Sequence, residues 1–284
     1  MRLTVLIENT LPNAEANAPV GLTAEHGLCV CVEANGLRIA ADAGASDAAW
    51  RNAALLGVDD GNFDMLVVSH GHYDHTGGAA EFARRNPTAP IYVQRSALGD
   101  FVHLDPGPDA RPRYIGVPES FAALPTLRLL DGAANLAHGV SVFAGIDDVR
   151  PAPRGNAVLK RRRSDGSCLD DDFRHEQCLV VEENGRRLLL SGCAHHGILN
   201  VLDRFRELYH TAPDLVLAGF HMRRKDGYEP QDLRDVRETA RELKKLEKTR
   251  FYTGHCTGDE PCAILKEELG EQIVVMHTGM RAEI

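Results

Sequence analysis

The sequence contains no stretch of about 18 consecutive apolar residues, the length that a membrane-spanning helix needs. Its first residues are apolar enough for a strand, but Glu8 and Asn9 interrupt them before they could form the apolar core of a secretion signal. We therefore expect a cytoplasmic protein with no membrane partner.

An excess of basic residues and an even set of cysteines are also missing. The net charge of −9 disfavours nonspecific nucleic-acid binding, which depends on Lys and Arg neutralising phosphates. Seven cysteines cannot all pair, and a chain of 284 residues needs no disulfides to bury a core, so we expect reduced thiols. What is present is an ordinary globular composition, 43% hydrophobic and 26% charged.

β-rich runs alternate with helical ones along the first part of the chain. Asn35 and Gly36 separate two apolar runs, which is a strong hairpin signal. The expected elements are strands at 3–7, 28–33, 37–41 and 65–68, and helices at 46–57 and from Gly77-Gly78 to before Pro87.

The second half of the chain repeats the first. Residues 32–39 resemble 181–188 at an offset of 149, and residues 64–68 resemble 214–218 at an offset of 150. A chance likeness is the alternative, because Asn-Gly hairpins and apolar strands are common, but the shared spacing favours a duplication. Two β-rich halves with helices would pack sheet on sheet with the helices outside. We therefore predict a single α/β domain, an αββα sandwich with two pseudo-symmetric halves, over residues 1–284.

Residues 151–175 look the least ordered and carry a basic run at 160–163 and an acidic run at 170–172. We interpret both runs as solvated and partly self-neutralising, with phosphate binding by the arginines as the alternative. Together with the loops around 8–26 and 100–120, this segment is expected to determine substrate specificity.

The segment His-Gly-His-Tyr-Asp-His follows directly on the expected strand at 65–68. Its residues His70, His72 and Asp74 alternate, so an extended backbone would point all three to one side. Imidazole and carboxylate are ligands of zinc, iron and manganese. Chance would give this combination about 0.002 times in a chain of this composition, so we expect a metal site here rather than a polar loop.

At these residues the sequence resembles the metallo-β-lactamase superfamily, whose signature is His-x-His-x-Asp-His after a strand. The resemblance implies the αββα fold and a pair of metal ions. It implies that His70 and His72 hold metal 1, and that Asp74 and His75 hold metal 2. It also implies that Asp42 fixes the turn behind the ligands and binds no metal itself.

Later strand ends should supply the other ligands. The apolar run that ends at Ser191 leads into Gly192-Cys193-Ala194-His195-His196. His195 is the expected third ligand of metal 1, and His196 is expected to be exposed at a helix start. Superfamily members commonly carry an aspartate after the glycine, where it bridges both metals. Cys193 stands there in this chain, so the bridge is absent or a thiolate supplies it.

A further strand end contains Gly254, His255 and Cys256. It resembles the last ligand position of the superfamily, so His255 is assigned to metal 2, with a capping or core histidine as the alternative. Cys256 is expected to be a buried neighbour of the site.

His221 follows the apolar run at 215–218 and lies one position from the counterpart of His70 in the repeat. A pseudo-twofold arrangement of the halves would turn it toward the site. Substrate binding, proton transfer, metal ligation and a purely structural role all stay open for it. The histidines without such a context are left without a role: His26, His103, His138, His175, His210 and His277.

The resemblance implies two divalent ions, with zinc expected first and manganese or iron as alternatives. Two metals about 3.5–4 Å apart can lower the pKa of a shared water and polarise a carbonyl or phosphoryl oxygen. We therefore predict a metal-dependent hydrolase in which a metal-bound hydroxide attacks an ester, thioester, lactone, amide or phosphoester of a small-molecule substrate. Asp74 and His221 are the catalytic candidates.

A longer resemblance favours a transferase instead. The segments Gly-Cys-Ala-His-His-Gly, Gly-Phe-His-Met and His-Cys-Thr-Gly are similar to those of dihydropterin-ribofuranosylaminobenzene-phosphate synthases, with mild differences at Ala194, His196, Ala218 and Met222. Such an enzyme would activate a pterin alcohol or diphosphate leaving group and not water. Diiron oxygen reductases of this fold rank third, because they carry glutamate where His72 stands. A nucleic-acid-binding module ranks last, and the oligomeric state stays open.

Overall fold

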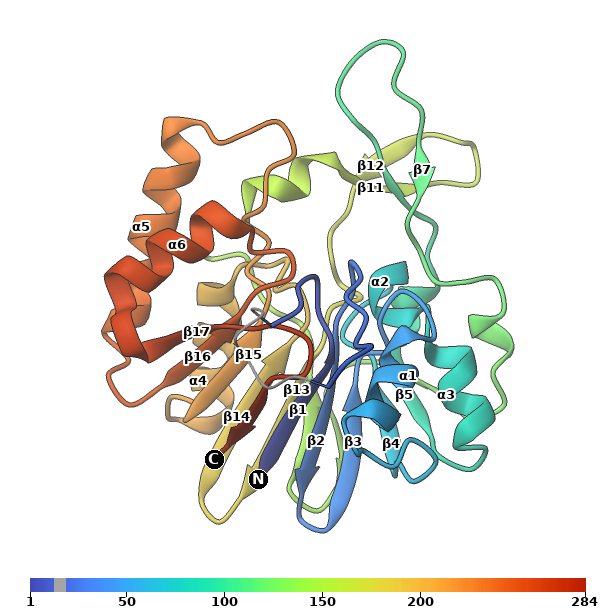
Figure 1. Cartoon of the computed structure of the whole chain (residues 1–284). Helices are drawn as coiled ribbons and strands as arrows, with labels where there is room; N and C mark the ends of the chain where they lie inside the picture. Colours follow the sequence, from blue (N-terminus) through green and yellow to red (C-terminus); the bar gives the residue numbers. More distant parts are fainter. Residues whose placement is uncertain (13–18) are drawn as a thin grey trace.

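The computed structural model describes residues 1–12 and 19–284, and it contains two large β-sheets with helices on both outer faces (Figure 1). Residues 13–18, part of the expected specificity loop at 8–26, lie outside the described residues. The predicted αββα sandwich is therefore confirmed. Among the described helices, none is long and apolar enough to cross a membrane.

Each large sheet has seven strands. The first has the order β18 (Arg281–Glu283), β1 (Arg2–Ile7), β2 (Cys29–Ala34), β3 (Leu37–Ala41), β4 (Met65–Val67), β5 (Ile91–Gln94), β8 (Leu127–Leu130). The second has the order β17 (Ile273–Val275), β16 (Arg250–Thr253), β15 (Leu215–Ala218), β14 (Arg186–Ser191), β13 (Cys178–Glu183), β10 (Val140–Phe143), β9 (Ala134–Ala137). The longer helices follow strands: α1 (Ala48–Leu55) and α3 (Ala79–Arg85) in the first half, and α4 (Ile198–Tyr209), α5 (Pro230–Lys244) and α6 (Asp259–Leu269) in the second.

The two large sheets share one topology, which confirms the internal repeat. Going from β18 to β8, and likewise from β9 to β17, the first three strand pairings are antiparallel and the last three are parallel. The repeat extends to a polar detail at the strand ends. Asp64 accepts a hydrogen bond from the Arg38 backbone N–H at 2.7 Å, and Asp214 accepts one from Arg187 N–H at 2.8 Å. Both halves therefore use the same device to position their fourth strand in this order.

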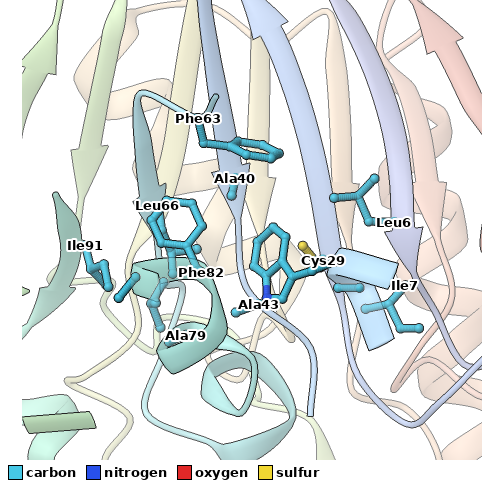
Figure 2. Close-up of a cluster of buried hydrophobic side chains, with 14 of the residues drawn as sticks. Leu6, Ile7, Cys29, Ala40, Ala43, Phe63, Leu66, Ala79, Phe82 and Ile91 are labelled. Carbon is cyan, nitrogen blue, oxygen red and sulfur yellow. The ribbon is translucent and has the colours of Figure 1, made fainter. Parts of the chain in front are cut away.

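Apolar side chains fill three layers. The layer between the sheets takes residues from both halves, among them Val5, Val32, Val181, Leu190 and Leu217. The layer under α1 and α3 contains Leu66, Phe63 and Phe82 (Figure 2). The layer under α4, α5 and α6 contains Phe205, Phe220 and Phe251. Apolar packing therefore holds each sheet on both of its faces. The carboxyl ends of the strands are not needed for this packing and can carry polar groups.

Trp50 on α1 is the only tryptophan of the chain and is fully buried. Its Nε1–H donates to the Gly78 carbonyl oxygen at 2.8 Å. We expect Trp50→Phe to lower the free energy of unfolding by about 2 kcal/mol, because the buried carbonyl loses its donor and a small cavity is left. Chemical denaturation followed by circular dichroism measures this without tryptophan fluorescence.

The matched control is Leu55→Ala on the same helix, because the Leu55 side chain is 45% exposed. This substitution should lower the free energy of unfolding by about 0.5 kcal/mol or less, as at other surface positions. A Trp50→Phe midpoint equal to that of the wild type would contradict the assigned role of the hydrogen bond.

A third, smaller sheet rises above the sandwich at the top of Figure 1. Its strands are β12 (Cys168–Asp170), β11 (Leu159–Arg162), β6 (Phe101–His103) and β7 (Arg113–Tyr114). The segment at 151–175, which looked the least ordered, therefore contains a hairpin of β11 and β12. The hairpin is stabilised by the pairing of β11 with β6, a long-range contact that the sequence does not reveal. Three basic side chains of the run, those of Lys160, Arg161 and Arg162, pair with carboxylates; Arg162 lies 2.8 Å from Asp100. Asp171 is an exception in the acidic run: it is buried, so the prediction of a solvated run is wrong at this residue.

Candidate metal centre

The histidine-rich segment connects β4 to α3 and contains one helical turn, α2 (Tyr73–Thr76). His72 is extended, with φ −95° and ψ 150°, and the helix begins directly after it. Asp74 therefore lies on a helical turn, and the prediction of one extended backbone for all three ligands is wrong there. The turn crosses a neighbouring loop so closely that a Cβ on Gly77 would lie 2.0 Å from the Ala45 carbonyl oxygen, so only glycine fits.

His70, His72 and His195 form the first group of donors, meaning side chains whose atoms could bind a metal ion. One ring nitrogen of each lies within 4.8 Å of those of the other two, and the Nε2 atoms of His70 and His195 are 3.3 Å apart. His195 comes from the loop after β14, where the buried Glu176 carboxylate accepts hydrogen bonds from the backbone N–H of His195 at 2.7 Å and of His196 at 3.2 Å. The structure therefore brings together the three residues that the sequence assigned to metal 1.

Asp74, His75 and His255 form the second group. The Nε2 atoms of His75 and His255 are 3.2 Å apart. Asp74 Oδ2 lies 3.4 Å from His255 Nε2 and 3.8 Å from His75 Nε2. These are the residues that the sequence assigned to metal 2.

The facing ring nitrogens fit the ligands of a tetrahedral metal ion. With a Zn–N distance of about 2.0 Å, two tetrahedral ligand nitrogens lie about 3.3 Å apart. In four of these histidines an oxygen faces the other ring nitrogen, Nδ1: Ser69 Oγ for His70 (2.9 Å), Asp42 Oδ2 for His75 (2.7 Å), Asn156 Oδ1 for His195 (3.1 Å) and Asn9 Oδ1 for His255 (3.0 Å). Acceptors at Nδ1 leave the Nε2 lone pairs for a cation. In the described part of the chain, the buried His72 Nε2 also has no hydrogen-bond partner.

The first group is electrically neutral at ordinary pH. Burial first, and neighbouring imidazoles second, hold the pKa values of His70 and His195 well below the usual value for histidine. The same causes lower the pKa of His72 to about 3. Neutral imidazoles are the form that binds a metal ion, so this group is ready to bind a cation without losing protons.

The second group contains charges of both signs. Burial alone lowers the pKa of His75, but the carboxylates of Asp42 and Asp74 outweigh it and raise the pKa to about 9. Burial raises the pKa of Asp74, but His75 and His255 outweigh it, and the net pKa lies below the usual value. A cation that binds here must displace the proton of His75, so binding is coupled to proton release.

Asn9, two residues after the end of β1, positions His255 from two sides. Its Oδ1 accepts from His255 Nδ1–H at 3.0 Å, and its Nδ2 donates to the His255 carbonyl oxygen at 2.9 Å. We expect Asn9→Ala to weaken metal binding about 10–100-fold, the usual effect of removing such a partner. Titration of the metal-free protein with zinc in a competing chelator measures it, with the exposed Asn135→Ala as control. Equal affinities in both variants would rule out this role for Asn9.

His221 and His26 are two further histidines that lie beside the two donor groups. The ring centre of His221 lies 4.3 Å from that of His195. One potential ligand atom each of His221, Cys193 and His195 lies within 4.8 Å of the other two. His26 received no role from the sequence, yet its Nε2 lies 3.3 Å from Asp74 Oδ2 and its ring stacks on that of His255 at 4.9 Å. No local motif marks His26, since only folding brings the loop before β2 to this point.

His196 differs from its prediction. The sequence placed it exposed at the start of α4, but it is 7% exposed. Its Nδ1 faces Asp148 Oδ1 at 2.8 Å and its Nε2 faces the Phe173 carbonyl oxygen at 3.2 Å, so both ring nitrogens point away from the donors. Burial alone lowers the pKa of His196, but Glu176 and then Asp148 outweigh it and raise the pKa, which suits a ring that donates twice.

A cavity of about 480 Å³ opens over the donors. Asp74, Cys193, His195 and His221 line its floor, and Arg113, Arg223, Arg224 and Lys225 belong to its wall. The expected specificity loops at 100–120 and 151–175 contribute, but residues 223–227 were missed. Their Arg-Arg-Lys-Asp-Gly sequence looks like an ordinary exposed turn, and only its place after β15 turns it over the site.

The chain is similar to known proteins in both sequence and fold. Residues 22–141 match the model of the metallo-β-lactamase superfamily. A 7,8-dihydropterin-6-methyl-4-(β-D-ribofuranosyl)-aminobenzene-5′-phosphate synthase of Methanocaldococcus jannaschii is 25% identical, over 90% of this chain and 88% of the relative. The crystal structure of a metal-dependent hydrolase of the β-lactamase superfamily superposes with a TM-score of 0.81 at 24% identity, covering 100% of this chain and 99% of that one. A diphosphatase of the PhnP family follows, with a TM-score of 0.52 at 16% identity over 100% of this chain and 97% of that one. This chain is thus similar over residues 22–141 to the metallo-β-lactamase superfamily, and its fold is that of a solved β-lactamase-superfamily structure.

Proposed function

We propose that this protein is a metal-dependent hydrolase that acts on a small-molecule ester, thioester, lactone, amide or phosphoester. The observation that carries the proposal is the pair of facing imidazole groups, 3.3 and 3.2 Å apart, directly below an open cavity. His70, His72 and His195 would hold one divalent cation, and Asp74, His75 and His255 the other. When bound, such a pair of ions would lower the pKa of a water and polarise the oxygen of the bond to be cleaved.

The chain's own residues supply the remaining functions. The Asp74 carboxylate, which is ionised and lines the cavity, can accept a hydrogen bond from the attacking water and orient it. His221 lines the same cavity, with its ring 4.3 Å from that of His195, so it can bind the substrate or hold a proton for the leaving group. Asp42 holds His75 in place from behind at 2.7 Å.

The charge around the cavity favours a phosphoester within this range of substrates. Arg113 and Arg223 line the cavity, and neither forms an ion pair within the described residues 1–12 and 19–284. Guanidinium groups bind phosphate oxygens in bidentate geometry. A phosphate-bearing substrate would therefore place its anionic group under the 223–227 loop.

A second candidate is a transferase of the pterin-biosynthesis type, supported by the relative that is named as a dihydropterin-aminobenzene-phosphate synthase and aligns with 90% of this chain. The same basic wall would hold the phosphate of an arylamine partner or the diphosphate of a pterin. In that case the cavity must exclude water from the reacting centre, and the arylamine must attack in its place.

Elemental analysis of the freshly purified protein, with no metal added, tests the shared part of both candidates. About two zinc or manganese ions per chain, as dinuclear sites of this kind hold, would support the proposal; two iron ions would move the assignment to redox chemistry, and no metal would overturn it. A panel of phosphoesters, thioesters, lactones and esters then tests hydrolysis. Product that forms only when both a pterin diphosphate and the arylamine are present would favour the transferase.

A further inference from the structure

Cys193 occupies the centre of the donor cluster. It follows β14 and Gly192, is 3% exposed and lines the floor of the cavity. Its Sγ lies 3.2 Å from His75 Nε2. The sulfur is therefore as close to this imidazole as the imidazoles are to each other.

The same sulfur is within reach of both donor groups. Its distances to one ring nitrogen each of His70 and His75 are within 4.8 Å, and so are its distances to His195 and His221. It also forms a cluster of this size with His255 and Cys256. The first group contributes His70 and His195 to these clusters, and the second contributes His75 and His255. Cys193 thus lies between the two groups.

The backbone around Cys193 is held on both sides. The Gly192 carbonyl oxygen accepts from Gly219 N–H at 2.7 Å, which ties the end of β14 to the end of β15. After Cys193 the chain turns at Ala194, with φ 46°, and Glu176 holds the next two backbone N–H groups. The backbone position of Cys193 is therefore set by the fold, and only rotation about χ1 of its short side chain moves the sulfur.

Cys193 differs from the buried cysteines that only fill space. Cys29 and Cys178 lie inside the apolar layers under the helices, among aliphatic and aromatic side chains. Cys193 instead has imidazole and thiol neighbours and faces the cavity. A side chain placed only for packing would not need this surrounding of ligand atoms.

We propose that the Cys193 thiolate is a ligand shared by the two metal ions and that it makes the site selective for zinc over manganese and magnesium. Thiolate is a soft ligand that favours zinc, whereas manganese and magnesium favour carboxylate and water. The inference rests on the proposed metal-dependent function, because it assigns a ligand within that site.

Cobalt substitution tests the proposal independently of catalysis. The metal-free full-length protein is loaded with Co²⁺, and its near-ultraviolet spectrum is recorded for the thiolate-to-cobalt charge-transfer band. The variants are Cys193→Ser, which removes the sulfur, and Cys193→Asp, which offers a carboxylate in its place. Cys256→Ser removes the neighbouring thiol of the site, and Cys168→Ser in the small third sheet is the matched control outside the site. Bound cobalt is counted for each protein, and circular dichroism checks its fold.

The expected result is a charge-transfer band in the wild type and in Cys168→Ser, and its loss in Cys193→Ser and Cys193→Asp. In a competition between Mn²⁺ and Zn²⁺, the bound ratio should shift toward manganese in Cys193→Asp. A band that persists in both Cys193 variants and disappears in Cys256→Ser would overturn the assignment. Bound cobalt without any band in the wild type would overturn the thiolate ligand but leave the metal site standing. Failure of the wild type to bind cobalt would overturn the proposed function as well.

Discussion

Replacing Asp74 by alanine is expected to lower the turnover of the metal-loaded protein about a thousandfold. Removing the carboxylate takes away a donor of the second metal group and the acceptor that orients the attacking water. Together these contribute several kcal/mol to transition-state stabilisation, and each 1.36 kcal/mol is a factor of about ten in rate. Asp74 lies on α2 with its Oδ2 3.4 Å from His255 Nε2 and 3.8 Å from His75 Nε2, so its carboxylate faces both histidines of that group.

The measurement combines elemental analysis with the rate on the best substrate of the hydrolysis panel. The variant should lose part of its metal and nearly all of its activity. The matched control is Asp170→Ala, because the Asp170 side chain is 89% exposed and lies outside the cavity. If Asp74→Ala retained both its metal content and its turnover, the proposed mechanism would be wrong.

Replacing Asp42 by alanine is expected to lower the free energy of unfolding of the metal-free protein by about 3–5 kcal/mol, the usual cost of breaking a buried ion pair on one side. Asp42 and His75 are fully buried and meet at 2.7 Å. The same carboxylate accepts hydrogen bonds from the Ser69 backbone N–H at 2.7 Å and from the Ser69 hydroxyl at 2.8 Å. Alanine would leave the imidazole of His75 and the Ser69 amide buried without this acceptor.

Chemical denaturation in the presence of a chelator measures the loss without any contribution from metal binding. Asp148→Ala is the matched control, because Asp148 also pairs with a histidine, His196, but its side chain is 57% exposed. An exposed pair of this kind contributes at most about 1 kcal/mol. Equal losses in the two variants would show that burial does not set the strength of the Asp42 pair.

The first half of the chain could be predicted closely because its signals are local. Asn35 and Gly36 form the turn between β2 and β3 as expected, and β4 ends just before the histidine-rich segment. The helix predicted at 46–57 is shorter in the structure, at Ala48–Leu55, since helix ends depend on the surrounding chain. The repeat made the sandwich predictable as well, because two equal β-rich halves can bury their apolar faces only against each other.

The prediction was weakest where residues far apart in the sequence meet. The third sheet forms only because β11 finds β6, more than fifty residues earlier, at Arg161 and Phe101. Asp171 belongs to an acidic run that resembles a solvated surface, yet its Oδ2 lies 4.0 Å from the Nε2 atom of His72, which is 99 residues earlier in the chain. Neither contact has a local signal, because both depend on how the segment at 151–175 folds back.

The sequence by itself determined the fold class, the repeat and the metal-ligand candidates, because hydrophobic periodicity and closely spaced ligand residues are local properties. His70, His72, Asp74 and His75 could be named in this way before any coordinates. Only the tertiary structure decided which way each ring points and what stands behind it. It placed His26 and the 223–227 loop beside the site, buried His196 away from it, and put the Cys193 sulfur between the two donor groups. The physical reason is that strand ends from both halves meet at one edge of the sandwich, and the pairing of the strands alone determines which side chains meet there.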